Sequence, residues 1–241
     1  MDPQLKRGEV VANREVSPGI FLLEVRGRFV ASPGQFYMLR AWELDPPLSR
    51  PMSVFALEER KIAFLYEVRG RGTRLLSRLS PGDELLLLGP LGRGWASPDR
   101  PLALVAGGTG IAPIHFAAQL YGGDAFLGFR GKPYLVESFV DWCREVHVAS
   151  ETGEGGLKGV VTEIFRPEGY RTCFACGPEG MLRELHRICR GADVPLFVSV
   201  EERMACGLGA CLGCTVLTSR GPRKVCVDGP VFPVEELWGD G

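Results

Sequence analysis

The sequence has few histidines and no run of like charge. Its 3 histidines stand apart at positions 115, 147 and 186, and no Ser/His/Asp arrangement or pair of carboxylates indicates acid–base catalysis. We expect His115 and His186 to be helix-surface or core residues rather than catalysts. The formal net charge is -1, without a block that would follow a phosphate backbone or an anionic lipid surface. Nucleic acid and membranes are therefore not expected partners.

The first residues also lack the apolar stretch of a secretory signal. Residues 1–8 read MDPQLKRG, so we expect a cytoplasmic location. In that reducing compartment the 8 cysteines are expected to be metal ligands or core residues rather than disulfides. Residues 101–123 carry no Lys, Arg, Asp or Glu, but their glycines and Pro113 indicate a strand, a turn and a helix start rather than a membrane span.

Short β-type runs separated by turn residues fill the first hundred residues. Three Ser-Pro-Gly turns begin at Ser17, Ser32 and Ser80. Several short strands at this spacing predict a small antiparallel β-barrel over residues 1–99. The expected strands cover residues 9–16, 20–25, 35–39, 53–56, 61–66 and 84–88.

The pattern changes after residue 99 to buried apolar strands that alternate with helical stretches. This alternation predicts a doubly wound parallel α/β domain over residues 100–199. Its strands are expected at 102–106, 125–129, 146–149, 171–175 and 196–199, with the clearer helices at 111–120 and 179–190. From Val200 the pattern dissolves into glycine and cysteine, and residues 200–241 hold too little apolar material to fold without a metal or a partner. The fold class is therefore a two-domain α+β chain with a small C-terminal tail.

Four cysteines near the end of the chain have the spacing of a plant-type [2Fe-2S] site. Cys206, Cys211 and Cys214 are separated by four and then two residues, and Cys226 follows after eleven more. Thiolates that converge on a compact cluster need a tightly turning backbone, which the glycines at 207, 209 and 213 supply. A structural zinc site is the alternative, although zinc knuckles usually present two Cys-x2-Cys pairs and this stretch has one.

Two further motifs follow expected strands of the second domain. The strand at 102–106 leads into Gly107-Gly108-Thr109-Gly110-Ile111-Ala112-Pro113, a turn that lets a phosphate approach the backbone at a helix start. A merely structural turn explains this motif equally well. Cys176-Gly177-Pro178 follows the strand at 171–175, where doubly wound sheets bind ligands. Cys173 and Cys176 also form a Cys-x2-Cys pair, but thiol redox or zinc chemistry is less favoured there because no second pair lies nearby.

In the expected barrel, Arg50-Pro51-Met52-Ser53 lies at the start of a strand. A guanidinium can bind a pyrophosphate through two hydrogen bonds, and a serine hydroxyl can hydrogen-bond the edge of a flavin ring. By composition alone these are ordinary residues at a strand start.

In this order, the motifs Arg-Pro-x-Ser, Gly-Gly-Thr-Gly-Ile-Ala-Pro, Cys-Gly-Pro and the cysteine-rich tail resemble the ferredoxin-NADP reductase superfamily. The tail is similar to that of the electron-transfer subunits of type B dihydroorotate dehydrogenase, through Glu201-Glu202-Arg203-Met204-Ala205-Cys206-Gly207 and Cys226-Val227-Asp228-Gly229-Pro230-Val231-Phe232. Many ferredoxin reductases have Tyr at the position of Met52, and an aliphatic residue there suits the dihydroorotate subunit. The resemblance covers essentially the whole chain.

The resemblance implies three bound groups and no catalytic residue in this chain. FAD would lie on the barrel, with its pyrophosphate near Arg50 and its ring near Ser53, among Pro51, Met52, Glu67, Val68, Arg69, Gly72 and Thr73. NAD would bind in the second domain, at Gly107, Gly108, Thr109, Gly110, Cys176 and Gly177. The [2Fe-2S] cluster would be held by Cys206, Cys211, Cys214 and Cys226.

The resemblance also implies a reaction. Electrons would pass from the FMN of a partner dihydroorotate dehydrogenase subunit through the cluster and FAD to NAD+, within a heterotetramer that serves pyrimidine biosynthesis. Dihydroorotate itself would be oxidised in the partner, and the residues leave NAD or NADP open. The alternatives are an equivalent reductase subunit of a hydrogenase, a sulfide dehydrogenase or a transhydrogenase, and a zinc-stabilised binding module without redox activity.

Overall fold

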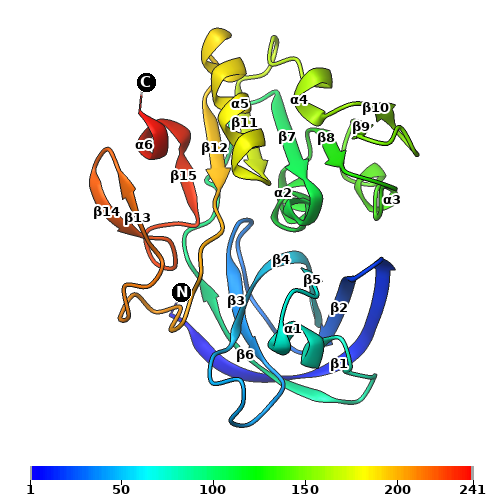
Figure 1. Cartoon of the computed structure of the whole chain (residues 1–241), viewed down its shortest axis with the longest axis vertical. Helices are drawn as coiled ribbons and strands as arrows, with labels where there is room; N and C mark the ends of the chain where they lie inside the picture. Colours follow the sequence, from blue (N-terminus) through cyan, green and yellow to red (C-terminus); the bar gives the residue numbers. More distant parts are fainter. Residues whose placement is uncertain (1, 240–241) are drawn as a thin grey trace.

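The first part of the chain forms a closed antiparallel barrel, as the turn spacing predicts. The computed structural model describes residues 2–239, and Figure 1 shows the barrel below a parallel sheet. The strands follow each other around the barrel in the order β1-β2-β5-β4-β3-β6. Their bounds are β1 (Gln4–Ser17), β2 (Ile20–Arg26), β3 (Phe36–Arg40), β4 (Arg50–Glu58), β5 (Lys61–Glu67) and β6 (Glu84–Leu91), and the short helix α1 (Arg71–Leu76) lies between β5 and β6.

Both faces of strand β5 are buried, because one face packs inside the barrel and the other packs against the second domain. Side chains alternate along a strand, so Ile62 and Phe64 point into the barrel core. Ala63 and Leu65 point outward, where they join a core cluster that includes residues of the second domain such as Ile114. The barrel is therefore a platform for the second domain, and not a separate body.

The second part of the chain forms the predicted parallel sheet. Its order is β10-β9-β8-β7-β11-β12-β15, and all neighbours pair in parallel except β15 with β12. The bounds of its strands are β7 (Leu102–Gly107), β8 (Asp124–Phe129), β9 (Glu145–Ser150), β10 (Leu157–Lys158), β11 (Thr172–Cys176), β12 (Leu196–Ser199) and β15 (Val231–Pro233).

Helices cover the two faces of this sheet. Along β7, Leu104 and Ala106 face one cluster, whereas Ala103 and Val105 face the other. The first face carries α2 (Ile111–Tyr121) and α3 (Glu137–Val140), and the second carries α4 (Val161–Ile164) and α5 (Glu179–Gly191). Burial on both faces explains why the strands read as unbroken apolar runs. Within residues 2–239, no helix is long and apolar enough to span a membrane.

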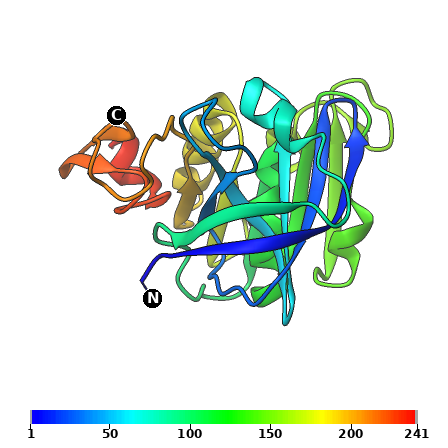
Figure 2. The ribbon, with the colours of Figure 1, turned by 90° about the horizontal axis from the view of Figure 1, so that it is seen from below.

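The tail is more regular than its sequence indicates. It contains the hairpin β13 (Thr215–Thr218) and β14 (Gly221–Lys224), the strand β15 and the helix α6 (Val234–Trp238). Figure 2 shows these segments, in orange and red, beside the rest of the molecule. Their apolar residues pack on the barrel, since Val225 and Phe232 share a core cluster with Phe36 and Leu91. The rest of this chain thus provides the support that the tail lacks in its own sequence.

The division of the chain into segments 1–99, 100–199 and 200–241 stays a proposal. The last barrel strand ends at Leu91 and β7 begins at Leu102, so the boundary at residue 99 falls in the connection between them. Trp95 anchors this connection, because its ring stacks on Phe174 with centroids 5.2 Å apart. We retain 1–99, 100–199 and 200–241 as the proposed segments, with β15 of the third completing the sheet of the second.

Asp124 is a buried carboxylate at the start of β8. It accepts hydrogen bonds from Nε of Arg144 at 3.0 Å, from Nη2 of the same guanidinium, and from the hydroxyl of Tyr170 at 2.9 Å. Burial raises the pKa of Asp124, but the hydrogen bonds from Arg144 and Tyr170 outweigh it and bring the pKa below its ordinary value. The ionised carboxylate therefore ties β8 to the segments that lead into β9 and β11.

We predict that Asp124→Asn lowers the free energy of unfolding at pH 7 by about 1–3 kcal/mol, because an amide cannot accept all three hydrogen bonds. Since the folded-state pKa is depressed, this stabilisation is present above the unfolded-state pKa and is lost as the pH falls through the folded-state pKa. Urea unfolding at neutral and strongly acidic pH measures both effects. Asp99→Asn, at an exposed position, is the control, and an equal effect of Asp124→Asn at both pH values would contradict the assignment.

Candidate functional site

The strand order of the parallel sheet reverses between β7 and β11. From β7 the chain builds outward through β8, β9 and β10, and it then returns to add β11 and β12 on the other side. Doubly wound sheets bind ligands at the carboxyl ends of the strands beside such a reversal. β7 ends at Gly107 and continues into the turn Gly108–Gly110, and β11 ends at Cys176, directly before Gly177. The structure thus brings the two predicted nicotinamide segments together, at the edge of the sheet that faces the barrel (Figure 1).

These two segments approach so closely that Gly110 has no room for a side chain. A Cβ atom at Gly110 would lie 2.3 Å from the carbonyl oxygen of Cys176. The thiol of Cys176 is buried and hydrogen-bonded to Ser199, its register partner on β12. Burial raises the pKa of this thiol, which therefore stays neutral. The arrangement offers a tight backbone surface beside a polar but uncharged side chain.

Arg50 begins β4 and lies against the first turn of α1. A Cβ atom at Gly72 would lie 2.5 Å from Nε of Arg50, so the glycine permits this contact. The guanidinium also lies over the ring of Trp42, 5.6 Å from its centroid, and Nη1 donates to the carbonyl of Leu48 at 2.6 Å. A fixed guanidinium beside the N–H groups of a helix start suits a pyrophosphate, so these residues fit the one that FAD would bring.

The remaining flavin candidates lie on β4 and at the end of β5, which pair with each other. Pro51, Met52 and Ser53 follow Arg50 along β4 and are half-buried, as are Glu67 and Val68. The contacts of these residues with FAD stay predictions.

Thr73 has a structural role that the sequence did not reveal. Its Oγ1 accepts hydrogen bonds from the backbone N–H groups of Arg69 at 3.0 Å and Gly70 at 3.1 Å, and it donates to the carbonyl of Gly70. These bonds use the full capacity of the hydroxyl, which orders the turn before α1. The side chain of Arg69 is likewise engaged, because Nε donates to Glu67 Oε2 at 2.6 Å. We therefore expect the backbone N–H of Thr73, and not its hydroxyl, to donate a hydrogen bond to a phosphate.

The cysteine loop is folded against the outside of the barrel. Cys214 and Cys226 are buried in a cluster with Met38 of β3, whereas Cys206 is half-buried and Cys211 is exposed. The backbone of the loop turns through left-handed conformations at Gly207 (φ 71), Gly209 (φ 78) and Leu212 (φ 59). Two of the three predicted glycines thus have the expected role, but Leu212 rather than Gly213 makes the third left-handed turn.

The four thiols are arranged as two interacting pairs. Cys206 contacts Cys211, and Cys214 contacts Cys226, whose backbone N–H lies 3.5 Å from Sγ of Cys214. Within residues 2–239, no three Cys, His, Asp or Glu side chains already stand as ligands around one metal ion. The assignment of the four cysteines as cluster ligands therefore stays a prediction, which the soft thiol donors and their convergence in one loop fit.

The backbone of the loop favours the thiolate of Cys206. Its N–H groups at Leu208, Cys211 and Ala210 point at Sγ, with Leu208 N at 3.3 Å. Burial raises the pKa of Cys206, but these hydrogen bonds and the contact with Cys211 bring it down to about 6. Burial and the hydrogen bond with Cys214 instead raise the pKa of Cys226 to about 12. Backbone N–H groups aimed at a thiolate are also the donors that stabilise cysteine-bound clusters.

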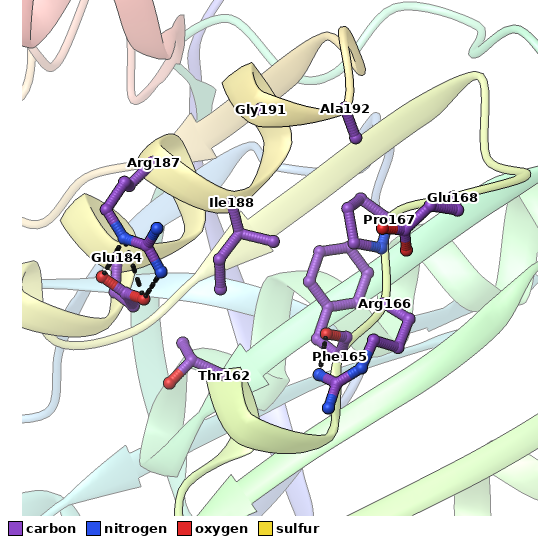
Figure 3. A pocket seen from close by; sticks show the side chains of 10 residues that line it. All are labelled: Thr162, Phe165, Arg166, Pro167, Glu168, Glu184, Arg187, Ile188, Gly191 and Ala192. Atoms are coloured by element: carbon purple, nitrogen blue, oxygen red, sulfur yellow. Dashed lines mark hydrogen bonds and ion pairs between the residues drawn. The ribbon is translucent and has the colours of Figure 1, made fainter.

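A cavity of about 370 Å³ lies far from these segments, at the amino ends of the strands between α4 and α5. Figure 3 shows that Arg187 on its wall is paired with Glu184, at 2.6 Å, while Arg166 donates to the carbonyl of Phe165. Both arginines of the cavity are thus engaged locally, and the cavity does not belong to the candidate site.

Comparison with known proteins identifies the family. The family described as the iron-sulfur cluster binding domain of dihydroorotate dehydrogenase B matches residues 201–238. The electron transfer subunit of dihydroorotate dehydrogenase B (NAD(+)) from Clostridium acetobutylicum is 42% identical over 234 residues, which cover 95% of each chain. The chain belongs to the family of dihydroorotate dehydrogenase B electron transfer subunits. The corresponding subunit from Caldanaerobacter subterraneus is 38% identical over 96% of this chain and 97% of the relative.

Solved structures agree with this family. The NADH-dependent reduced ferredoxin-NADP oxidoreductase, an electron-bifurcating flavoprotein, superposes with a TM-score of 0.86 at 29% identity and covers 97% of this chain and 90% of the other. The ferredoxin reductase of carbazole 1,9a-dioxygenase has a TM-score of 0.66 at 21% identity, covering 81% of this chain and 68% of the other, and shares the fold. The predicted resemblance to ferredoxin-NADP reductases and to the dihydroorotate dehydrogenase B subunits is confirmed.

In this electron transfer subunit, the two cysteines of the Cys-x2-Cys pair lie on opposite faces of β11. Cys173 is buried in the cluster on the α5 side, where it contacts Cys189, and Cys176 is buried in the cluster on the α2 side. They cannot bind one metal ion or form one disulfide. Sequence reasoning missed Trp42 beneath Arg50 and Ser199 beside Cys176, because both contacts join segments that only the folded sheet and barrel bring together.

We predict that Gly110→Ala weakens nicotinamide dinucleotide binding by at least about tenfold, since the added Cβ must separate the two turns and shift the binding backbone. The FAD content of the electron transfer subunit should stay unchanged. Gly191→Ala is the matched control, because its Cβ would meet nothing within 4 Å. Titration with NADH measures the affinity, and unchanged binding by Gly110→Ala would remove this turn from the site.

Proposed function

We propose that this chain passes electrons from the FMN of a partner dihydroorotate dehydrogenase subunit, through a [2Fe-2S] cluster and FAD, to NAD+. Dihydroorotate is oxidised in the partner. The two kinds of subunit form a heterotetramer in the cytoplasm, and the complex serves pyrimidine biosynthesis. Family membership at 42% identity over nearly the full length supports this function. FAD and the cluster supply the electron-carrying chemistry when bound, and the protein supplies binding, orientation and local electrostatics.

The observation that carries this proposal is the contact of the cysteine loop with β3, the strand that pairs with the proposed flavin strand β4. A Cβ at Gly207 would lie 2.9 Å from Cγ of Met38 on β3, and β3 pairs with β4, where Met38 faces Pro51. The proposed cluster ligands are thus one strand away from the proposed flavin strand, and the nicotinamide turn lies over the same barrel. The neighbourhood of these three proposed sites supports a transfer of electrons from the cluster to FAD and on to NAD+.

Each proposed site contributes a different physical effect. Arg50 and the start of α1 at Gly72 and Thr73 would meet the pyrophosphate of FAD. The residues that would line its ring system are Pro51, Met52, Ser53, Glu67, Val68 and Arg69. Gly107, Gly108, Thr109, Gly110, Cys176 and Gly177 would hold the dinucleotide, with the neutral thiol beside it. The N–H groups of the loop would stabilise negative charge on the sulfur ligands, namely Cys206, Cys211, Cys214 and Cys226.

A second candidate is a reductase subunit of a transhydrogenase type. It is favoured by the structural match to the ferredoxin-NADP oxidoreductase, which covers 97% of this chain at 29% identity. The same fold and the same cofactor segments would serve it, and only the partner would differ. The identity to dihydroorotate dehydrogenase B subunits, at 42%, favours the first candidate.

Copurification with the partner tests the function. The complex should reduce NAD+ when dihydroorotate is added, whereas neither chain alone should do so. A partner that is reduced by ferredoxin or NADPH, without any response to dihydroorotate, would favour the transhydrogenase candidate. A colourless protein that contains zinc but neither iron nor flavin would instead support the zinc-stabilised binding module.

We predict that Cys211→Ser abolishes the cluster but leaves FAD on the barrel, because the two sites draw on different segments. Iron analysis and the flavin absorbance of the purified variant measure the two groups separately. Cys173→Ala is the control, since Cys173 is buried in the parallel sheet and should not affect iron content. Full iron content in Cys211→Ser would show that the ligand assignment is wrong.

A further inference from the structure

Helix α2 connects the nicotinamide turn to the flavin strand. It begins at Ile111, directly after the turn Gly107–Gly110, and packs against β4, the strand that starts with Arg50. Two of its side chains, His115 and Gln119, are one helical turn apart and reach the backbone of β4. A shift of α2 along β4 would therefore move one proposed cofactor site relative to the other.

Gln119 pairs with β4 as a neighbouring strand would. The backbone N–H of Leu57 donates to Oε1 at 3.1 Å, and Nε2 donates to the carbonyl of Leu57 at 3.0 Å. Both polar groups of one residue on β4 are thus satisfied by a single amide, which fixes position along the strand as well as distance. If α2 slid by one residue, about 1.5 Å, both bonds would be lengthened and misaligned.

His115 makes the second polar contact, in a buried position. Its Nδ1 lies 2.9 Å from the carbonyl oxygen of Phe55, and its Nε2 lies 3.1 Å from that of Ser138, just inside α3. The ring stacks on Phe55 with centroids 4.0 Å apart and an interplanar angle of 6°. Burial lowers the pKa of His115 despite the two carbonyls, so the ring is neutral and has one N–H to donate. One carbonyl therefore accepts a hydrogen bond from the ring N–H, and the other does not.

Apolar packing is incomplete beside this pair. A cavity of about 230 Å³ opens between the barrel and the second domain, and both His115 and Gln119 line it. The remaining apolar contacts are non-directional and do not specify a position along the strand. The hydrogen bonds at Phe55 and Leu57 are directional contacts of α2 with β4 itself, whereas Tyr121 at the end of α2 donates to the carbonyl of Trp95 outside the strand.

We propose that His115 and Gln119 are positioning residues that set the placement of the nicotinamide turn over the flavin strand. This proposal rests on the proposed function, in which FAD exchanges electrons with a dinucleotide held by that turn. The two residues touch neither group and act through α2 and β4. Their role is to hold the reacting rings at the short separation on which the transfer rate depends.

The first test replaces Gln119 by Met, which has a similar volume and no hydrogen-bonding amide. In the complete complex, the limiting rate of FAD reduction by NADH should fall at least about tenfold, because small displacements of reacting groups are costly. The affinity for NADH and the contents of FAD and iron should stay the same. Hydrogen exchange at the amide of Leu57 should become about tenfold faster, as the loss of one hydrogen bond implies. Leu120→Gln, an exposed position on the same helix, is the control.

The second test separates the two contacts of His115. His115→Asn retains a donor near the position of Nδ1, towards Phe55, whereas His115→Gln retains one near Nε2, towards Ser138. If the contact with the barrel sets the position, the Asn variant should keep most of the reduction rate and the Gln variant should lose it. A merely structural role predicts instead that both variants lose stability while the limiting rate is retained.

Two results would overturn the proposal. One is an unchanged limiting rate in Gln119→Met despite faster exchange at Leu57, and the other is an equal rate in the two His115 variants. If Gln119→Met does not fold, the His115 pair decides. If the wild-type complex is not reduced by NADH at all, the proposed function fails, and the exchange at Leu57 still shows whether Gln119 holds α2 on the barrel.

Discussion

The packing of α2 on the outer face of the barrel is the contact on which the rest of the structure depends. Ala63 and Leu65 point out of the barrel into the same cluster as Ile114 and Leu104, so one apolar core spans both domains. The burial of this face holds the sheet edge with the glycine turn against the barrel, and the hydrogen bonds of His115 and Gln119 with β4 add direction to this contact. Without it the two halves would be held only by the connection at Trp95 and by the tail, which packs on the barrel and pairs with β12.

The chain holds its candidate groups by backbone geometry more than by charged side chains. Gly110 and Gly72 admit close approach, the loop N–H groups surround Cys206, and Arg50 is the one guanidinium among the proposed ligands that is fixed against an aromatic ring. Such sites need little proton chemistry, which agrees with the scarcity of histidine in the sequence. Buried Cys176 extends the pattern, because its raised pKa keeps a neutral thiol beside the turn that we propose to bind the dinucleotide.

Most of the fold could be predicted from the sequence, since it is encoded in local patterns. Apolar runs and Ser-Pro-Gly turns gave strands and helices within a few residues of their observed bounds, and the spacing of four cysteines indicated their common loop. The contacts of His115, the pairing of β15 with β12 and the left-handed turn at Leu212 could not be predicted. Each depends on residues far apart in the sequence, or on a strained backbone that the surrounding packing stabilises. Thr73 shows the same limit within the candidate site, because its hydroxyl is used by the turn.

The pairing of β15 with β12 makes the cysteine segment an insertion between two neighbouring strands. Ser199 at the end of β12 is the register partner of Val231 at the start of β15, so residues 200–230 leave and rejoin the sheet at one point. The pairing of β12 with β15 holds the two ends of this loop together. The contacts of the sheet therefore compensate for the entropy that is lost when the loop closes. Acquiring or losing a metal group in such a loop need not disturb the strands on either side. The sheet thus fixes both ends of the cysteine segment, while its buried residues Cys214, Val225 and Cys226 cover apolar side chains of the barrel.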